Sequence, residues 1–293
     1  MNQNTNTQVL AALALTFNAF VWGTSWWPFR LLEARGLHPL WTTVFVYALS
    51  CIVIVVARPH AVAQVVRAPA LWVLVLASGT TNAAFNWAVV IGDVVRVVLL
   101  FYLMPLWAVL LARVLLGERL TPLAGVRVLL AIGGAAIVMW PAGGGWPVPD
   151  GLADWLGVLG GFSFALNNVM LRRESQRSDE SRALSMFAGG VLVAGVLASV
   201  LAARGNLAWP ADAGPAWGLG VALLGGLFLL SNFALQYGAA RLTASATAVI
   251  LLSEVLFAAA SALALGGGTL TVPLVMGGTL IVLAALLSSV SKR

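Results

Sequence analysis

Glu254 is the one carboxylate that lies inside an apolar stretch of this sequence, at the middle of residues 243–265. An acidic side chain at that depth in hydrocarbon costs about 2.5–3.5 kcal/mol. It could bind the ammonium group of a solute, carry a proton, or stay protonated in a hydrogen bond to a neighbouring helix. Thr243, Thr247 and Ser261 share its helical face, a pattern that a polar cavity wall or close helix packing would produce.

Pairs of polar residues four positions apart recur in three other apolar stretches. Because an unpaired amide in hydrocarbon costs several kcal/mol, each pair must face protein or water. The pairs either line a common aqueous cavity or join neighbouring helices. Neutral amides both donate and accept, which suits a zwitterionic solute better than an anion. The pairs are Asn82 and Asn86, Ser163 and Asn167, and Asn232 and Gln236.

Aromatic residues occur in the same stretches, away from the ends where an interfacial belt would place them. Trp22 and Trp26 are expected to share one helical face. Core packing explains any single aromatic residue as well as solute contact does. Together they would form flat walls for an aromatic side chain and a cation–π surface for an ammonium group. The candidates for solute binding are Trp22, Trp26, Phe85, Tyr102 and Tyr237.

Pro105 lies in the middle of the apolar residues 94–116. A proline there clashes with the preceding turn and removes a backbone hydrogen bond, which leaves the carbonyl of Phe101 free. We therefore expect a kink or hinge at Pro105. Small residues four positions apart predict close helix packing on two further stretches. They are Gly157 and Gly161, and Gly218, Ala222 and Gly226.

These residues require helices that cross a bilayer. The 293 residues are 61% hydrophobic and 9% charged, which leaves too little polar surface for a water-soluble globule. The apolar runs approach the ~20 residues that span ~30 Å of hydrocarbon and lack the alternation of barrel strands. We expect an all-α integral membrane protein with ten transmembrane helices. The ten runs are Val9–Phe29, Trp41–Ala57, Leu71–Val90, Val94–Leu116, Leu123–Trp140, Trp155–Leu171, Leu184–Ala203, Trp217–Ala239, Thr243–Leu265 and Val272–Val290.

The basic residues predict the orientation. With the N-terminus in the cytoplasm, twelve of the sixteen Lys and Arg residues fall on the cytoplasmic side. The positive-inside rule then places both termini in the cytoplasm. A net charge of +6 and a pI of about 10.7 are explained by topology, so nucleic-acid binding is not expected.

A Gly/Pro-rich linker over residues 141–154 divides the ten runs into five and five. We expect one five-helix repeat over residues 1–140 and a second over residues 155–293. An odd number of helices inverts the second repeat, and inverted repeats are typical of alternating-access transporters with sites at the midplane. An offset of 149 residues aligns Pro105 with Glu254.

Enzyme motifs are absent, because the sequence has no Walker loop, no H-E-x-x-H and no G-x-S-x-G. His38 and His60 lie in connections without a cysteine or acidic cluster, so no metal site is expected. Cys51 is the only cysteine, and no cofactor is predicted. The alternative to a transporter is a membrane-embedded enzyme or assembly factor for lipid-linked substrates. The sequence makes no prediction of the oligomeric state.

Short motifs of both halves resemble the drug/metabolite transporter superfamily of the EamA type. The first half carries Trp22-Gly23-Thr24-Ser25, Pro105, residues 116–121 (LGERLT), Gly125 and Gly133-Gly134, and the second half opens with Asn167-Asn168-Val169 before Arg172-Arg173. The tryptophan-rich chain is most similar to the aromatic amino acid exporters of that superfamily.

The resemblance implies a ten-helix inner-membrane exporter whose central cavity is lined mainly by the first, third, fourth, sixth, eighth and ninth helices. Three sites depart from the superfamily pattern: Tyr47 replaces a frequent basic residue, Glu254 replaces a proline of the second repeat, and Gly266-Gly267-Gly268 replaces a Gly-Glu pair. We therefore expect alternating-access export of small organic solutes, most plausibly aromatic or large neutral amino acids.

Overall fold

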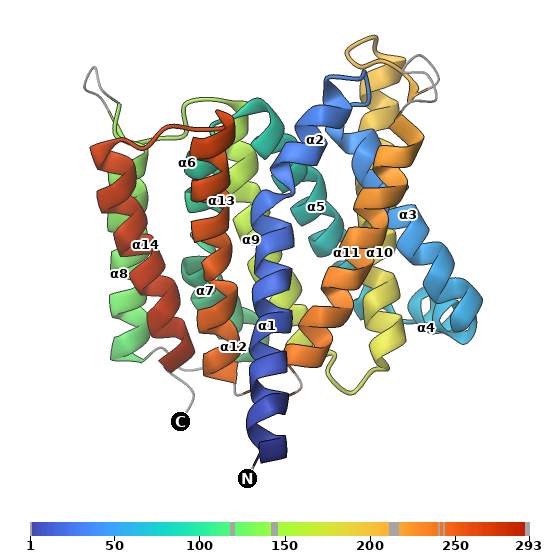
Figure 1. Ribbon diagram of the computed structural model, residues 1–293, viewed down its shortest axis with the longest axis horizontal. Coiled ribbons are helices and arrows are strands. Elements are labelled where there is room, and N and C mark those ends of the chain that lie inside the picture. Colours follow the sequence, from blue (N-terminus) through green and yellow to red (C-terminus); the bar gives the residue numbers. More distant parts are fainter. Residues whose placement is uncertain are drawn as a thin grey trace.

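The computed structural model describes residues 2–117, 121–141, 146–210, 217–239, 241–242 and 244–290, which form helices and no strand. The long helices run side by side as a bundle, and α1 begins at the same end of the bundle at which α14 ends (Figure 1). We call this the N-terminal end and the opposite end the far end. The first half comprises α1 (Asn2–Thr24), α2 (Trp26–Glu33), α3 (Pro39–Ala57), α4 (His60–Arg67), α5 (Pro69–Ile91), α6 (Val94–Phe101), α7 (Met104–Leu116) and α8 (Pro122–Val138). The second half comprises α9 (Leu152–Arg173), α10 (Asp179–Ala203), α11 (Trp217–Ala239), α12 (Ala244–Leu251), α13 (Ser253–Leu265) and α14 (Val272–Val290).

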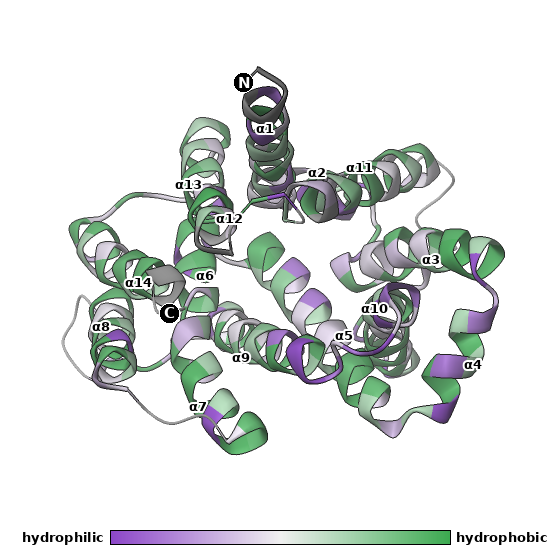
Figure 2. Cartoon of the chain, turned by 90° about the horizontal axis from the view of Figure 1, so that it is seen from below, coloured by the Kyte–Doolittle hydropathy of each residue, from purple (hydrophilic) through white to green (hydrophobic). Residues whose placement is uncertain are grey.

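Six helical segments are long and apolar enough to cross a membrane, and three further apolar helices are shorter. The chain is therefore an all-helical, multi-span membrane protein. Helix α9 belongs to neither set, because glycines and asparagines lower its hydropathy. It packs against α5, α6 and α7 (Figure 2), while Trp155 and Leu159 on another side of it are exposed.

Three of the expected spans are divided into two helices each. Ser25 separates α1 from α2, Tyr102 and Leu103 separate α6 from α7, and Leu252 separates α12 from α13. The second break comes directly before Pro105, whose missing N–H prevents a continuous helix. Pro28 follows Ser25 by three residues, the spacing at which Pro105 follows Tyr102, whereas no proline lies near the break at Leu252.

The two halves present helices of matching order and length. Helices α5 and α11 have 23 residues each, α6 and α12 have eight, and α7 and α13 have 13. Helices α7 and α13 both end at a left-handed glycine, Gly117 (φ 69°) and Gly266 (φ 71°), a conformation that favours glycine because a Cβ strains it. The short helices α2 and α4 have no counterpart among the described residues of the second half.

The first helix of each half packs on the other half. Helix α1 lies against α11, α12 and α13, while α9 lies against α5, α6 and α7. Gly23 permits the first contact, since a Cβ there would lie 2.6 Å from the carbonyl oxygen of Glu254. Gly161 permits the second, where a Cβ would lie 2.3 Å from the carbonyl oxygen of Phe101. Helix faces this close exclude even a methyl group.

The two predicted faces of small residues differ in outcome. Gly157 and Gly161 do pack closely, against the backbone of Val97 and Phe101. A Cβ added at Gly218 or Gly226 would meet no atom of the described residues within 4 Å. The prediction of close packing along that face of α11 was wrong, because the face turns away from its neighbours.

Candidate functional site

Tyr102 and Glu254 meet where the two broken helices approach each other. Tyr102 lies buried in the break between α6 and α7, and its hydroxyl donates to Oε2 of Glu254 at 3.3 Å. Glu254 lies in the first turn of α13, not in the middle of one continuous helix as the sequence indicated. The N-terminus of a helix favours negative charge, so the break lowers the cost of holding a carboxylate at this depth.

The Glu254 carboxylate has capacity for another donor. A hydroxyl–carboxylate bond is normally 2.5–2.7 Å long, whereas the bond from Tyr102 is 3.3 Å. The Glu254 side chain is half-buried, so part of its surface is accessible. An ammonium group or a proton could therefore reach an oxygen that Tyr102 does not occupy.

An aromatic cluster adjoins this pair. The Phe101 ring lies 4.8 Å from Phe85, 5.3 Å from Phe164 and 6.1 Å from Tyr102 between ring centroids. These are the separations at which aromatic pairs attract each other. The cluster joins α5, α6 and α9, so rings from both halves surround the Tyr102 end of the pair. Sequence reasoning selected Phe85 and Tyr102 but missed Phe101, which precedes Pro105 by four positions.

Pro105 affects the site through the backbone carbonyl of Phe101. Its missing N–H leaves the Phe101 carbonyl without its normal helical donor, and none of the described residues donates a hydrogen bond to this oxygen. Gly161 of α9 packs against it instead, in the manner of Cα–H···O contacts between close helices. The proline and the glycine thus shape one junction between α6, α7 and α9.

Trp22 and Trp26 lie in different parts of the core. Trp22 of α1 stacks on Phe228 of α11, with ring centroids 4.7 Å apart. Trp26 begins α2 and donates through Nε1 to Oγ of Ser261 at 2.9 Å. The prediction of a shared face was wrong, because the break at Ser25 turns the chain between the two rings. Trp22 is half-buried near the end of α1, whereas Trp26 is buried.

The asparagine pair of α5 faces α3. Asn82 accepts a hydrogen bond from Tyr47, and the Nδ2 of Asn86 donates to Oγ1 of Thr43 at 3.0 Å. The Thr43 hydroxyl already donates to the carbonyl of Pro39, so it must act as the acceptor for Asn86. This fixes the orientation of the amide. The buried Oδ1 of Asn86 then has no partner among the described atoms.

Residues 9–140 match the model of the EamA-like transporter family. The match covers the first half of the chain, which is therefore similar to this family. No curated protein sequence matches the chain. One solved crystal structure of a protein is similar over 96% of each chain, with a TM-score of 0.58 and 20% sequence identity. This similarity shows a shared fold.

Helix α9 brings two further candidates into the interior of the bundle. Ser163 and Asn167 are both buried, and the Oδ1 of Asn167 has no hydrogen-bond partner among the described atoms. An unpaired buried oxygen is costly. Asn86 and Asn167 therefore present two acceptors that a donor on a solute would satisfy.

The candidates on α11 are more dispersed. Asn232 is half-buried, and the side chain of Gln236 lies outside the described residues. Tyr237 lies near the N-terminal end of the bundle, with its ring 3.8 Å from the guanidinium carbon of Arg241. This cation–π contact stabilises the end of α11.

Sequence reasoning also missed a buried hydrogen bond between α1 and α11. Asn18 donates through Nδ2 to Oγ of Ser231 at 2.8 Å and to its carbonyl at 3.0 Å. Asn18 precedes Asn167 by the same 149 residues that separate Pro105 from Glu254. That correspondence was the signal that could have revealed it.

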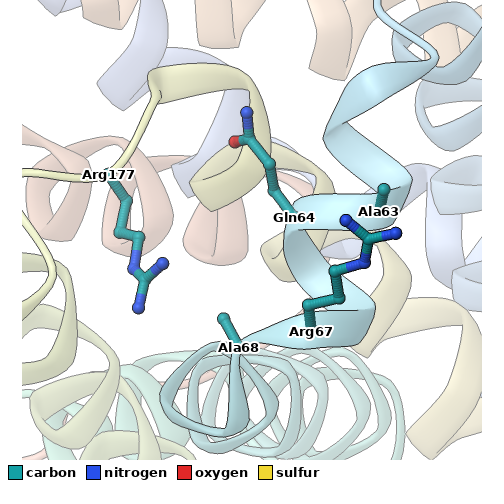
Figure 3. A pocket seen from close by; sticks show the side chains of 5 residues that line it. All are labelled: Ala63, Gln64, Arg67, Ala68 and Arg177. Carbon is teal, nitrogen blue, oxygen red and sulfur yellow. The ribbon is translucent and has the colours of Figure 1, made fainter.

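A surface pocket of about 270 Å³ lies beside α4 rather than at this site (Figure 3). Its polar lining consists of Gln64, Arg67 and Arg177, but Arg177 pairs with Glu174 at 3.1 Å. In Figure 3 the two guanidinium groups lie apart, with Gln64 between them. The pocket is therefore a solvated groove at the N-terminal end, remote from the paired breaks.

His38 has structural contacts at the start of α3. Nδ1 of His38 accepts from the backbone N–H of Leu40 at the start of α3, and its ring packs against Trp87. Burial lowers the pKa of His38 to about 4, which keeps the ring neutral. No group of three His, Cys, Asp or Glu residues in the described ranges could hold a metal ion.

Proposed function

We propose that this transporter exports aromatic or large neutral amino acids across the cell inner membrane by alternating access. The observation that carries the proposal is the Tyr102–Glu254 hydrogen bond between the two broken helices. Breaks in transmembrane helices expose helix ends and backbone groups that bind solutes near the midplane. A solute bound there would contact both halves, as alternating access requires.

The architecture behind this proposal is ten transmembrane helices in two inverted repeats. Residues 1–140 form the first repeat, residues 141–154 the linker and residues 155–293 the second repeat. The matching helix lengths and the reciprocal packing of α1 and α9 support this division. The break before Pro105 corresponds to the break at Leu252, and Pro105 is the proposed hinge.

Recognition would combine charge, amides and rings. Glu254 accepts the ammonium group, whose N–H donors form charge-assisted hydrogen bonds to its carboxylate. Amides can donate to the solute carboxylate and accept from its ammonium. Aromatic rings provide the apolar wall. The proposed binding residues are Trp22, Trp26, Asn82, Phe85, Asn86, Tyr102, Ser163, Asn167, Asn232, Gln236, Tyr237 and Glu254.

The proposed orientation has the N-terminal end of the bundle in the cytoplasm. A cysteine at Gln176, exposed in the α9–α10 connection, is expected to resist an impermeant thiol reagent added outside intact cells. A cysteine at Asn206, exposed in the α10–α11 connection at the far end, should react. Both variants use a Cys51→Ser background. The reverse labelling pattern would contradict the orientation that the positive residues predict.

The substrate assignment predicts a selective effect of Trp22→Ala. Removing the ring that stacks on Phe228 takes away apolar wall, so phenylalanine uptake into liposomes should fall roughly tenfold further than threonine uptake. Trp27→Ala, which changes an exposed tryptophan of α2, is the matched control and should leave the ratio unchanged. An equal loss for both amino acids would show that Trp22 supports the fold and not the choice of solute.

A further inference from the structure

The guanidinium group of Arg30 joins three backbone carbonyls at the far end of the bundle. Its Nε donates to Val89 at 3.1 Å, and its Nη2 donates to Gly92 at 2.6 Å and reaches Gly267 at 3.5 Å. Val89 and Gly92 end α5, whereas Gly267 lies in the connection from α13 to α14. One side chain of α2 therefore bridges the two halves of the chain.

The connection between α13 and α14 packs on the first half of the chain through Gly267 and Gly268. Gly267 packs on the Trp26 ring, where a Cβ would lie 2.5 Å from the nearest ring carbon. The Gly267 carbonyl also accepts from the N–H of Val94 at 3.0 Å. The Arg30 guanidinium carbon lies 4.9 Å from the centre of the same Trp26 ring. Trp26 is thus enclosed between the arginine and the connection.

Asp93 holds the same connection from the other side. Its Oδ2 accepts from the N–H of Thr269 at 2.8 Å, while its Oδ1 caps α6 by accepting from the N–H of Arg96 at 3.0 Å. Gly268 lies so close that a Cβ would be 2.9 Å from the Asp93 carboxylate. The carboxylate therefore fixes both the start of α6 and the connection between α13 and α14.

These contacts lie directly above the proposed solute site. Trp26 bonds to Ser261 of α13, and Ser261 follows Glu254 by seven residues, which is two helical turns or about 10 Å along the axis. Apart from the Trp26–Ser261 bond, the bridging bonds involve backbone groups at the end of α5, at the start of α6 and in the α13–α14 connection. Such bonds can exchange with water when the connections separate, unlike an interlocked apolar core.

We propose that Arg30, Asp93 and Trp26 form a latch that closes the far end of the transporter and must open to release solute outside. The proposal rests on the proposed transport function, because it assigns these contacts to one end of the solute path. It makes Arg30 and Asp93 positioning residues: they control access to Glu254 and do not touch the solute. The structure has this latch closed.

The test measures access to Ser261 from outside. In intact cells carrying Cys51→Ser and Ser261→Cys, a membrane-impermeant maleimide should label the closed protein slowly. Adding Arg30→Ala should raise the labelling rate at least tenfold, and Asp93→Asn should raise it less, because the amide can still accept a bond from Thr269. Arg35→Ala is the matched control, since Arg35 is exposed near the same end.

Equal labelling with and without Arg30→Ala would overturn the latch. A melting temperature of each purified variant separates opening from loss of fold, and Arg30→Lys keeps the charge with fewer donors as a second, milder variant. If Arg30→Ala unfolds the protein, unchanged labelling of Arg30→Lys would overturn the proposal. Because labelling requires no transport, absence of amino acid flux would contradict the proposed function and leave this result intact.

Discussion

Glu254→Gln is expected to weaken binding of a neutral amino acid by roughly ten- to a hundredfold. Hydrogen bonds to charged groups contribute about 1.5–3 kcal/mol, and each 1.4 kcal/mol changes affinity tenfold. Glutamine keeps the shape of the side chain and removes its charge, so the ammonium group loses its counter-ion. The measurement is the concentration dependence of exchange of labelled phenylalanine in proteoliposomes.

Two comparisons separate the roles that Glu254 could have. Tyr102→Phe retains the carboxylate and removes only the bond at 3.3 Å, so it should weaken binding much less than Glu254→Gln. If Glu254 carries a proton instead, Glu254→Gln abolishes accumulation driven by a pH gradient while exchange continues. Transport by Glu254→Gln at the wild-type rate at every pH would leave the residue with a structural role only.

Gly161→Ala is expected to destabilise the protein by about 1–3 kcal/mol or more, the typical cost of overpacking a tight core. The added methyl would lie 2.3 Å from the carbonyl oxygen of Phe101, which is backbone and cannot move aside as a flexible side chain would. Helix α9 must therefore shift away from the break before Pro105. Both the melting temperature in detergent and amino acid flux should fall.

Gly226→Ala is the matched control for this prediction. It also adds one methyl inside a long helix, but no described atom lies within 4 Å of the added carbon. Alanine is favoured over glycine in a helix by roughly 0.5–1 kcal/mol, so stability should be unchanged or slightly higher. Equal melting temperatures for the Gly161 and Gly226 variants would show that the α6–α9 junction is not tightly packed.

Much of the helical organisation is predictable from the sequence, because lipid imposes long apolar helices and leaves few alternatives. The break before Pro105 is predictable for the same local reason, since proline cannot donate a backbone hydrogen bond. The break at Ser25 has the same local signal, because Pro28 follows it by three residues. The break at Leu252 has no proline nearby and was not predictable from the local sequence.

The partners of the polar residues were also beyond local sequence patterns. An i, i+4 spacing shows that Asn82 and Asn86 share a face, but only the packing of α5 on α3 pairs them with Tyr47 and Thr43. Glu254 likewise appeared to be a mid-helix carboxylate and proved to lie at a helix start. Its contact with Tyr102 spans 152 residues of sequence, which no periodicity can reveal.

The contacts of the latch at the far end could likewise not be predicted from local sequence patterns. Its residues are scattered over α2, the α5–α6 connection and the α13–α14 connection, and each one alone resembles an ordinary helix-end residue. Gly267 and Gly268 depart from the superfamily pattern in sequence, and the structure shows why small residues suit these positions. A larger side chain would collide with Trp26 or with the Asp93 carboxylate.

Solute flux by the purified protein alone tests the central claim most directly. The protein is placed in liposomes, and uptake of labelled phenylalanine, tryptophan and methionine is measured beside a dianion and a lipid-linked sugar. The account predicts saturable flux of the three amino acids, with none for the dianion or the lipid. Saturable flux of the dianion or flipping of the lipid, with no flux of any amino acid, would contradict it.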